Sequence, residues 1–250
     1  MTPWSPVPSH LKLSCNPIVV GWEHLRPLHQ LRQLDLSNCN LTELPKALEG
    51  MESLTSLNLT VNRCERGWER LRPLHQLREL DLFLCRVTEL PMALAGMESM
   101  TRLVLGWNPI ESGWEWLRSL RQLLELNLEG CGLTEVPAAL AGMESVTRLN
   151  LRANPIKRGW EHLCPLPQLW ELDLKDCGLT EVTAALAGIK SVTFLNLTFN
   201  FTECGWEHLR ALTCLRELKV QEEEKDMPEA LKSLEDVTVV PIIEDDYENI

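Results

Sequence analysis

The sequence lacks the features that mark several protein classes. It contains no run of about 18 apolar residues, so no segment is suited to cross a bilayer as a helix. Its start, MTPWSPVPSHLKLSC, has no basic stretch followed by an apolar one, which argues against a secretory signal peptide. The 24 basic and 36 acidic residues give a net charge of −12 without a basic stripe. We therefore expect neither a membrane protein nor a nucleic-acid-binding protein.

Motifs for catalysis and for cofactor binding are also missing. There is no P-loop and no dinucleotide-binding fingerprint. No serine or cysteine is placed beside a histidine and an orienting acid, as a catalytic triad requires. The nine cysteines include no CxxC pair, so no metal site is indicated. We expect no enzyme activity, no cofactor and no metal. Many unpaired thiols favour a reducing compartment, the cytoplasm.

What the sequence does contain is a repeat. The dipeptide Gly-Trp, followed by Glu, recurs at residues 21, 67, 113, 159 and 205, each time 46 residues after the last. Each 46-residue unit divides into two 23-residue repeats with one leucine frame. Ten such repeats begin at residues 8, 31, 54, 77, 100, 123, 146, 169, 192 and 215.

Each repeat has apolar residues at positions 1, 4 and 6, as in Leu31, Leu34 and Leu36. Position 9 alternates strictly between Asn and Cys: Asn16, Cys39, Asn62, Cys85, Asn108, Cys131, Asn154, Cys177, Asn200. Because alternate residues of LxLxL point to one side of a strand, stacked copies would form a parallel sheet over a continuous core. At position 9, Asn can bond the backbone of neighbouring coils, and a free Cys can fill the same slot with weaker bonding. Prolines and glycines at position 20 limit helix length and predict only one or two helical or 3₁₀ turns per repeat.

The pattern LxxLxLxx(N/C)xL resembles the leucine-rich repeat family and matches its repeat length. The resemblance implies an α/β leucine-rich repeat solenoid, with a curved parallel sheet on the concave face and short helical or 3₁₀ turns on the convex face. We expect an N-terminal cap in residues 1–7, a solenoid of ten repeats in 8–236, and a partial terminal strand with an acidic tail in 237–250. Residues 221–250 hold 11 acidic and two basic side chains.

Side chains that differ between copies indicate candidate binding residues. Positions 2, 3, 5, 7 and 8 are predicted to lie on the strand and face the concavity. Position 3 alternates in charge and predicts mutual neutralisation (Glu79, Arg102, Glu125, Arg148, Glu171). Positions 7 and 8 share no rule of size or polarity, which fits either recognition or neutral variation at exposed sites.

Within positions 7 and 8, three consecutive repeats carry Val61, Leu84 and Trp107, with Phe83 beside them. We expect these four residues to form an exposed apolar patch that anchors a partner protein. The charged neighbours Glu129, Arg152, Lys175 and Asp176 would orient it, and Trp170, Phe194 and Phe199 form a second apolar group.

The resemblance implies a non-enzymatic module that binds a protein on its concave sheet and is a monomer when free. It is compatible with an inhibitor that occludes a partner's active site, an adaptor or an immune sensor. A bacterial effector delivered into the host cytosol is a further version, because the glutamates at 222–224 resemble export signals. The alternative is an extracellular pattern-recognition protein that binds carbohydrate or lipid.

Overall fold

The computed structural model describes residues 8–18, 20–221, 228–232, 234 and 237–241. Contacts between residues divide the chain into two compact units, residues 1–123 and residues 124–250. The predicted cap in residues 1–7 and the predicted tail from residue 242 onward lie outside the described residues.

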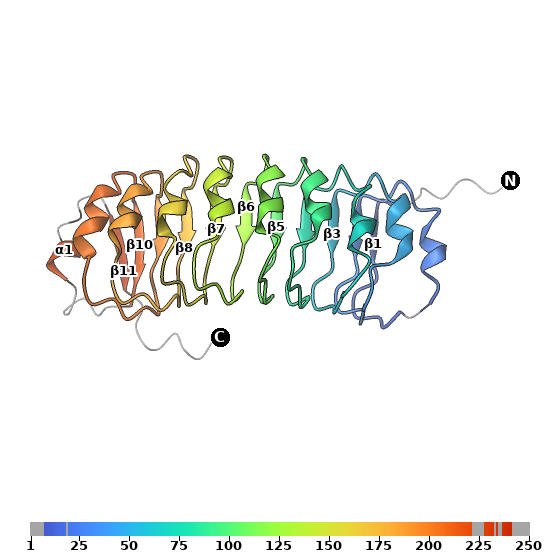
Figure 1. Ribbon diagram of the computed structural model, residues 1–250, viewed down its shortest axis with the longest axis horizontal. Helices are drawn as coiled ribbons and strands as arrows, with labels where there is room; N and C mark the ends of the chain where they lie inside the picture. The colour runs from blue at the N-terminus through green and yellow to red at the C-terminus, as the bar shows by residue number, and fades with distance from the viewer. Residues whose placement is uncertain (1–7, 19, 222–227, 233, 235–236, 242–250) are drawn as a thin grey trace. The chain divides into compact units, whose positions relative to one another are not determined.

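Unit 1 contains five short strands that alternate with five 3₁₀ helices (Figure 1). The strands are parallel and pair in chain order, so that repeat partners 23 residues apart stand side by side, as in Leu34, Leu57 and Leu80. The strands are β1 (His10–Lys12), β2 (Gln33–Asp35), β3 (Ser56–Asn58), β4 (Glu79–Asp81) and β5 (Arg102–Val104). The 3₁₀ helices are η1 (Trp22–Leu25), η2 (Lys46–Gly50), η3 (Trp68–Leu71), η4 (Met92–Gly96) and η5 (Trp114–Ser119).

Unit 2 repeats the same arrangement. Its strands are β6 (Glu125–Asn127), β7 (Arg148–Asn150), β8 (Glu171–Asp173), β9 (Phe194–Asn196), β10 (Glu217–Val220) and β11 (Thr238–Pro241), again parallel and in chain order. Its 3₁₀ helices are η6 (Ala138–Gly142), η7 (Trp160–Leu163), η8 (Ala184–Gly188) and η9 (Trp206–Ala211), and one α-helix turn, α1 (Glu229–Lys232), precedes β11.

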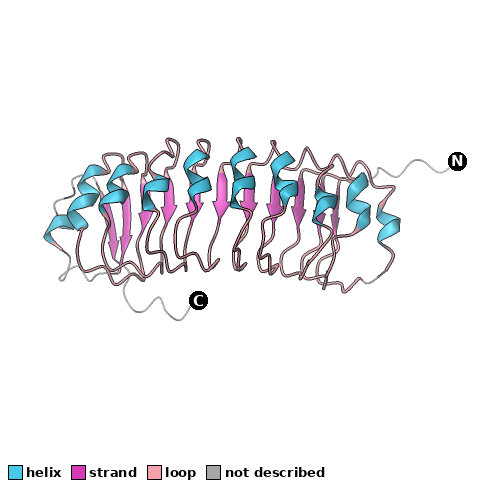
Figure 2. Ribbon diagram, viewed as in Figure 1, coloured by secondary structure: helices cyan, strands magenta, loops and turns pink. Residues whose placement is uncertain are grey.

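Within each unit the strands form one layer and the short helices form another (Figure 2). The leucine frame fills the space between the layers. Leu31, Leu34 and Leu36, at positions 1, 4 and 6, are at most 2% exposed. The same positions are buried in every later repeat through the tenth. The predicted frame, the parallel sheet, the 3₁₀ turns and the leucine-rich repeat solenoid are thus confirmed.

Position 9 joins neighbouring coils from inside. The Asn108 side chain accepts the N–H groups of Cys85 and Val87, each at 2.9 Å, and donates to the Leu82 carbonyl at 2.7 Å. The Cys85 thiol donates only one short hydrogen bond to the preceding coil, to the Leu59 carbonyl at 3.0 Å. The predicted contrast between a strongly bonding Asn and a weakly bonding Cys is therefore confirmed.

The recurring Gly-Trp dipeptide has a backbone explanation. Gly113 has φ 85°, in the left-handed region, and a Cβ there would lie 2.6 Å from the Leu90 carbonyl oxygen of the preceding coil. Only glycine combines that conformation with that close approach. Trp114 then begins η5. The 46-residue spacing of this dipeptide thus reflects how coils stack rather than a binding motif.

The structure corrects the prediction that positions 7 and 8 lie on the strands. β4 ends at Asp81, at position 5, and Phe83 and Leu84 follow in a turn. Leu84 has φ 55°, a left-handed conformation that does not occur within a strand. The candidate residues at positions 7 and 8 therefore lie in the turns that follow the strands.

Candidate binding surface

One backbone feature distinguishes the turn at position 8. In each of the first nine repeats this residue is left-handed, with φ between 52° and 62°: Cys15, Asn38, Val61, Leu84, Trp107, Gly130, Ala153, Asp176 and Phe199. Gly, Asn and Asp adopt this conformation readily, whereas it costs other L-residues about 1–2 kcal/mol. Val61, Leu84 and Trp107 thus occupy the position against the preference of the backbone.

Position 5 shapes the same turn. The carboxylate of Asp81 accepts the Phe83 N–H at 2.9 Å, and the amide oxygen of Asn58 accepts the Thr60 N–H at 2.9 Å, as in an Asx turn. Five other repeats make this bond, through Asp35, Asn127, Asn150, Asp173 and Asn196. The Asp or Asn at position 5 is the sequence signal for this turn, and the sequence prediction did not use it.

The structure brings together Val61, Phe83, Leu84 and Trp107, a surface that we call the apolar turn patch. The Val61 N–H donates to the Phe83 carbonyl at 2.8 Å, and the Leu84 N–H donates to the Gly106 carbonyl at 3.0 Å. Consecutive turns are thereby bonded to one another, so the side chains follow in a row. Val61, Leu84 and Trp107 are 45%, 44% and 48% exposed, and Phe83 is half-buried.

The four charged candidates lie in successive turns of unit 2. Arg152 Nε is 3.6 Å from a carboxylate oxygen of Glu129, and the Ala153 N–H donates to the Lys175 carbonyl at 2.9 Å. Burial, followed by the charge of Arg152, holds the pKa of Lys175 below its usual range. Asp176 is exposed. These four residues are therefore neighbours, and two of them already form an ion pair.

The second predicted apolar group, Trp170, Phe194 and Phe199, is covered by the chain's own cations. Each ring lies within reach of a cation–π contact. The three contacts are Arg148 over Trp170 (4.9 Å), Lys175 over Phe199 (4.4 Å) and Lys219 over Phe194 (5.2 Å). No such contact covers Phe83 or Trp107 within the described residues. The two predicted apolar groups therefore differ, because only the apolar turn patch presents aromatic rings without an intramolecular cation over them.

The alternating charges at position 3 neutralise one another in unit 2, as predicted. Arg148 pairs with Glu125 on one side and lies 3.2 Å from Glu171 on the other. In unit 1, Glu79 stands opposite Arg102 in the parallel register of β4 and β5. The unit 2 side chains are one third to one half exposed, so each pair contributes about 0–1 kcal/mol. These charged side chains therefore interact with one another within the chain.

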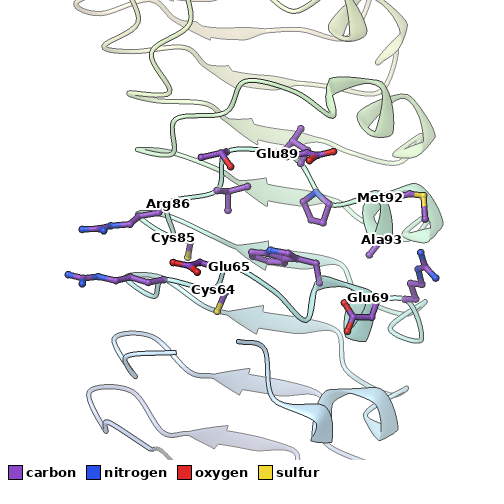
Figure 3. Close-up of a pocket in the computed structure, with 15 residues that line it drawn as sticks. Cys64, Glu65, Glu69, Cys85, Arg86, Glu89, Met92 and Ala93 are labelled. Carbon is purple, nitrogen blue, oxygen red and sulfur yellow. The ribbon is translucent and has the colours of Figure 1, made fainter. Parts of the chain in front are cut away.

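A groove of 580 Å³ lies in unit 1, lined among others by Trp68, Arg86 and Met92 (Figure 3), with Pro91 also in the lining. A second groove of 510 Å³ is lined by Trp22 and Pro45, at the same repeat positions 46 residues earlier. Because the groove recurs at the 46-residue interval of the double repeat, we attribute it to the alternation of Trp-containing and Pro-containing repeats. Its lining mixes Arg and Glu side chains and indicates no particular ligand.

Reactive side chains give no sign of a chemical site. All nine cysteines are free, and five are buried: Cys39, Cys64, Cys85, Cys131 and Cys177. Burial raises the pKa of the Cys64 and Cys177 thiols to about 12 and that of Cys85 to about 11, which makes them poor nucleophiles. Among the described residues, no three His, Cys, Asp or Glu side chains are grouped as metal ligands. None of the helices in that part of the chain has the length and apolar character needed to cross a membrane.

Comparison with known proteins agrees with the fold. A family model described as leucine rich repeat matches residues 9–64. The chain carries leucine-rich repeats and has the fold of a leucine-rich repeat solenoid. Leucine-rich repeat proteins are generally non-enzymatic scaffolds for protein–protein interaction. No curated protein sequence matches this one.

Solved leucine-rich repeat structures are similar across most of the chain. A leucine-rich repeat protein of Leptospira interrogans has a TM-score of 0.80 at 22% identity, covering 92% of this chain and 59% of that one. An internalin of Listeria monocytogenes has a TM-score of 0.71 at 24% identity, covering 86% of this chain and 62% of that one. Internalin C2 of the same organism has a TM-score of 0.62 at 20% identity, covering 80% of this chain and 84% of that one. The chain thus spans about three fifths of the length of the first two, and the likeness establishes the fold.

Proposed function

We propose that this leucine-rich repeat protein is a non-enzymatic protein-binding module whose main contact surface is the apolar turn patch. The observation that carries the proposal is the run of three large, half-exposed apolar side chains, Val61, Leu84 and Trp107, on a left-handed backbone position that the first nine repeats share. Each residue costs about 1–2 kcal/mol in that conformation. Since each side chain is 44–48% exposed, burial within the chain recovers only part of that cost. Backbone strain that packing does not explain is typical of functional sites.

The patch also has the composition of a binding surface. Exposed apolar clusters on soluble proteins commonly mark interaction sites, and aromatic anchors dominate the binding energy of many interfaces. Phe83 and Trp107 are the anchors here. In unit 2, Glu129, Arg152, Lys175 and Asp176 would supply orienting charges to a partner. Trp170, Phe194 and Phe199 would be weaker contacts, because their rings already face the cations of this chain.

The proposed mode of action is occupancy of a partner's surface. An inhibitor that covers an active site, an adaptor and a delivered bacterial effector would all act in this way. The nine free thiols support a reducing compartment, the bacterial or host cytosol. Titration of thiols in denatured protein from its native source tests this location. Nine free thiols would support it, and paired cysteines would favour an extracellular protein that binds carbohydrate or lipid.

The experiment for the binding surface is affinity capture followed by measurement with the purified partner. The test variant carries Leu84→Asn and Trp107→Asn, because Asn38 shows that this position accommodates Asn. The matched control carries Cys15→Asn and Ala153→Asn, at the same left-handed repeat position but outside the proposed contact residues. We expect the test variant to lose at least about 30-fold in affinity, the effect of removing a central aromatic anchor. A partner that binds both variants as tightly as the wild type would refute the proposal.

A further inference from the structure

Two arginines border the apolar turn patch. Arg63 follows Val61 by two residues, and Arg86 follows Leu84 by two residues, in each case across one buried position-9 residue. Both arginines are exposed. Figure 3 shows the Arg86 side chain extending away from the coil, on the side opposite Met92. The two arginines therefore belong to successive turns, and both also line the 580 Å³ groove of unit 1 together with Glu65 and Glu89.

Neither guanidinium group forms an ion pair or a hydrogen bond in the part of the chain that the structure describes. Other arginines of this chain pair with glutamates across neighbouring coils, in the pairs Arg66–Glu43, Arg70–Glu43, Arg148–Glu125, Arg152–Glu129 and Arg158–Glu135. Arg63 and Arg86 are thus two neighbouring positive charges without a carboxylate of their own.

Both arginines also depart from the repeat at position 10. Arg86 has φ 59°, and the corresponding residues of the other cysteine repeats are Asn40, Gly132 and Gly178, which suit a left-handed backbone. In the asparagine repeats, Arg63 stands where Pro17, Pro109 and Pro155 occur, and Phe201 is a second exception. Most copies have Gly, Asn or Pro at these two positions, so the frame does not account for either arginine.

We propose that the partner of the apolar turn patch is a protein segment in which carboxylate side chains alternate with or adjoin apolar ones. This inference rests on the proposed function and specifies its ligand. The apolar side chains would cover Leu84 and Trp107, and two carboxylates would pair with Arg63 and Arg86. Guanidinium groups bind carboxylates in a planar, bidentate manner. Because adjacent parallel strands are about 4.8 Å apart, the two carboxylates would lie at a similar spacing.

The test uses a displayed library of random twelve-residue peptides, selected on the wild-type protein and then measured on purified variants. The charge variant carries Arg63→Glu and Arg86→Glu. The matched control carries Arg26→Glu and Arg72→Glu, two exposed arginines that follow η1 and η3 and lie outside the patch, so the net charge is the same. We expect the selected peptides to be rich in Asp or Glu next to Leu, Phe or Trp. We also expect the charge variant to bind them at least about tenfold more weakly than the control does. Peptides with Lys in place of the acidic residues should regain affinity for the charge variant.

The outcomes separate this inference from the proposed function. Peptides that lose affinity for the Leu84→Asn/Trp107→Asn variant but are unaffected by the charge variant would overturn the acidic partner and keep the binding surface. A selection that yields no peptide dependent on Leu84 and Trp107 would overturn both. Self-association of the wild type that the charge variant abolishes, measured by sedimentation, would make a second copy the occupant and overturn the inference.

Discussion

The strain argument makes a prediction about stability that does not depend on any partner. Val61 is β-branched, left-handed at φ 56° and 45% exposed. Asn38 holds the same repeat position one coil earlier, at φ 52°, and is exposed. We expect Val61→Asn to stabilise the protein and the reciprocal Asn38→Val to destabilise it. This is the reverse of the usual effect of exchanging an apolar residue for a polar one.

The magnitude follows from two opposing terms. Replacing a β-branched residue by Asn in this conformation relieves about 1–1.5 kcal/mol, the larger part of the left-handed penalty. Full burial of a valine side chain contributes about 1.5 kcal/mol, and Val61 is only about half covered, so its removal costs about 0.7 kcal/mol. The net gain for Val61→Asn is therefore about 0.3–0.8 kcal/mol, and Asn38→Val should lose a similar amount.

The assay is urea denaturation of the wild type and both variants at one pH and one salt concentration. An unchanged slope is required, so that a shift of the midpoint reports stability alone. The two variants should differ by about 0.6–1.6 kcal/mol, with Val61→Asn the more stable. If Asn38→Val proves the more stable of the two, the claim that strain at position 8 opposes these apolar residues is wrong. Val61→Asn should also bind the partner less tightly, an exchange of function for stability.

Three further predictions test other parts of the structure. Asn108→Ala should lower the free energy of unfolding by about 3 kcal/mol or more in urea denaturation, because buried N–H groups lose their acceptor. Asn108→Cys should lower it less, since Cys occupies position 9 in alternate repeats. Equal losses would contradict the role given to position 9. At about pH 8, a thiol reagent should label the exposed cysteines quickly and the buried ones only on unfolding; the exposed ones are Cys15, Cys164, Cys204 and Cys214. The raised pKa values of Cys64, Cys85 and Cys177 mean that the unfolded chain, with thiol pKa values near 9.0, loses protons first. The contribution of these thiols to stability should therefore be constant below about pH 9 and should be lost as the pH rises through about 11 to about 12. Urea midpoints measured above about pH 9 test this, and a flat profile there would contradict the burial of these thiols.

The fold could be predicted from the sequence because every repeat has the same pattern of apolar positions. A leucine at one position is weak information, but the frame of Leu31, Leu34 and Leu36 recurs at 23-residue intervals, and one geometry satisfies all copies. The alternation of Asn and Cys at position 9 could be interpreted in the same way, from the hydrogen bonds that each side chain can form. The partial strand near the end also follows the frame, as β11 (Thr238–Pro241).

The candidate surface was less accessible to sequence reasoning, because the backbone conformation is not visible in residues such as Val61 and Trp107. Their place after the strand was missed, although Asn38 at the same position and the Asx residues at position 5 together indicate a left-handed turn. This conformation also bears on the two interpretations that the sequence left open. Neutral variation at an exposed turn would favour residues that the backbone accepts, as Asn38 and Asp176 illustrate, but Cys15, Ala153 and Phe199 hold the same conformation. What sets Val61, Leu84 and Trp107 apart is that they are large, apolar, half-exposed and consecutive, which fits the partner-binding role that we propose for them.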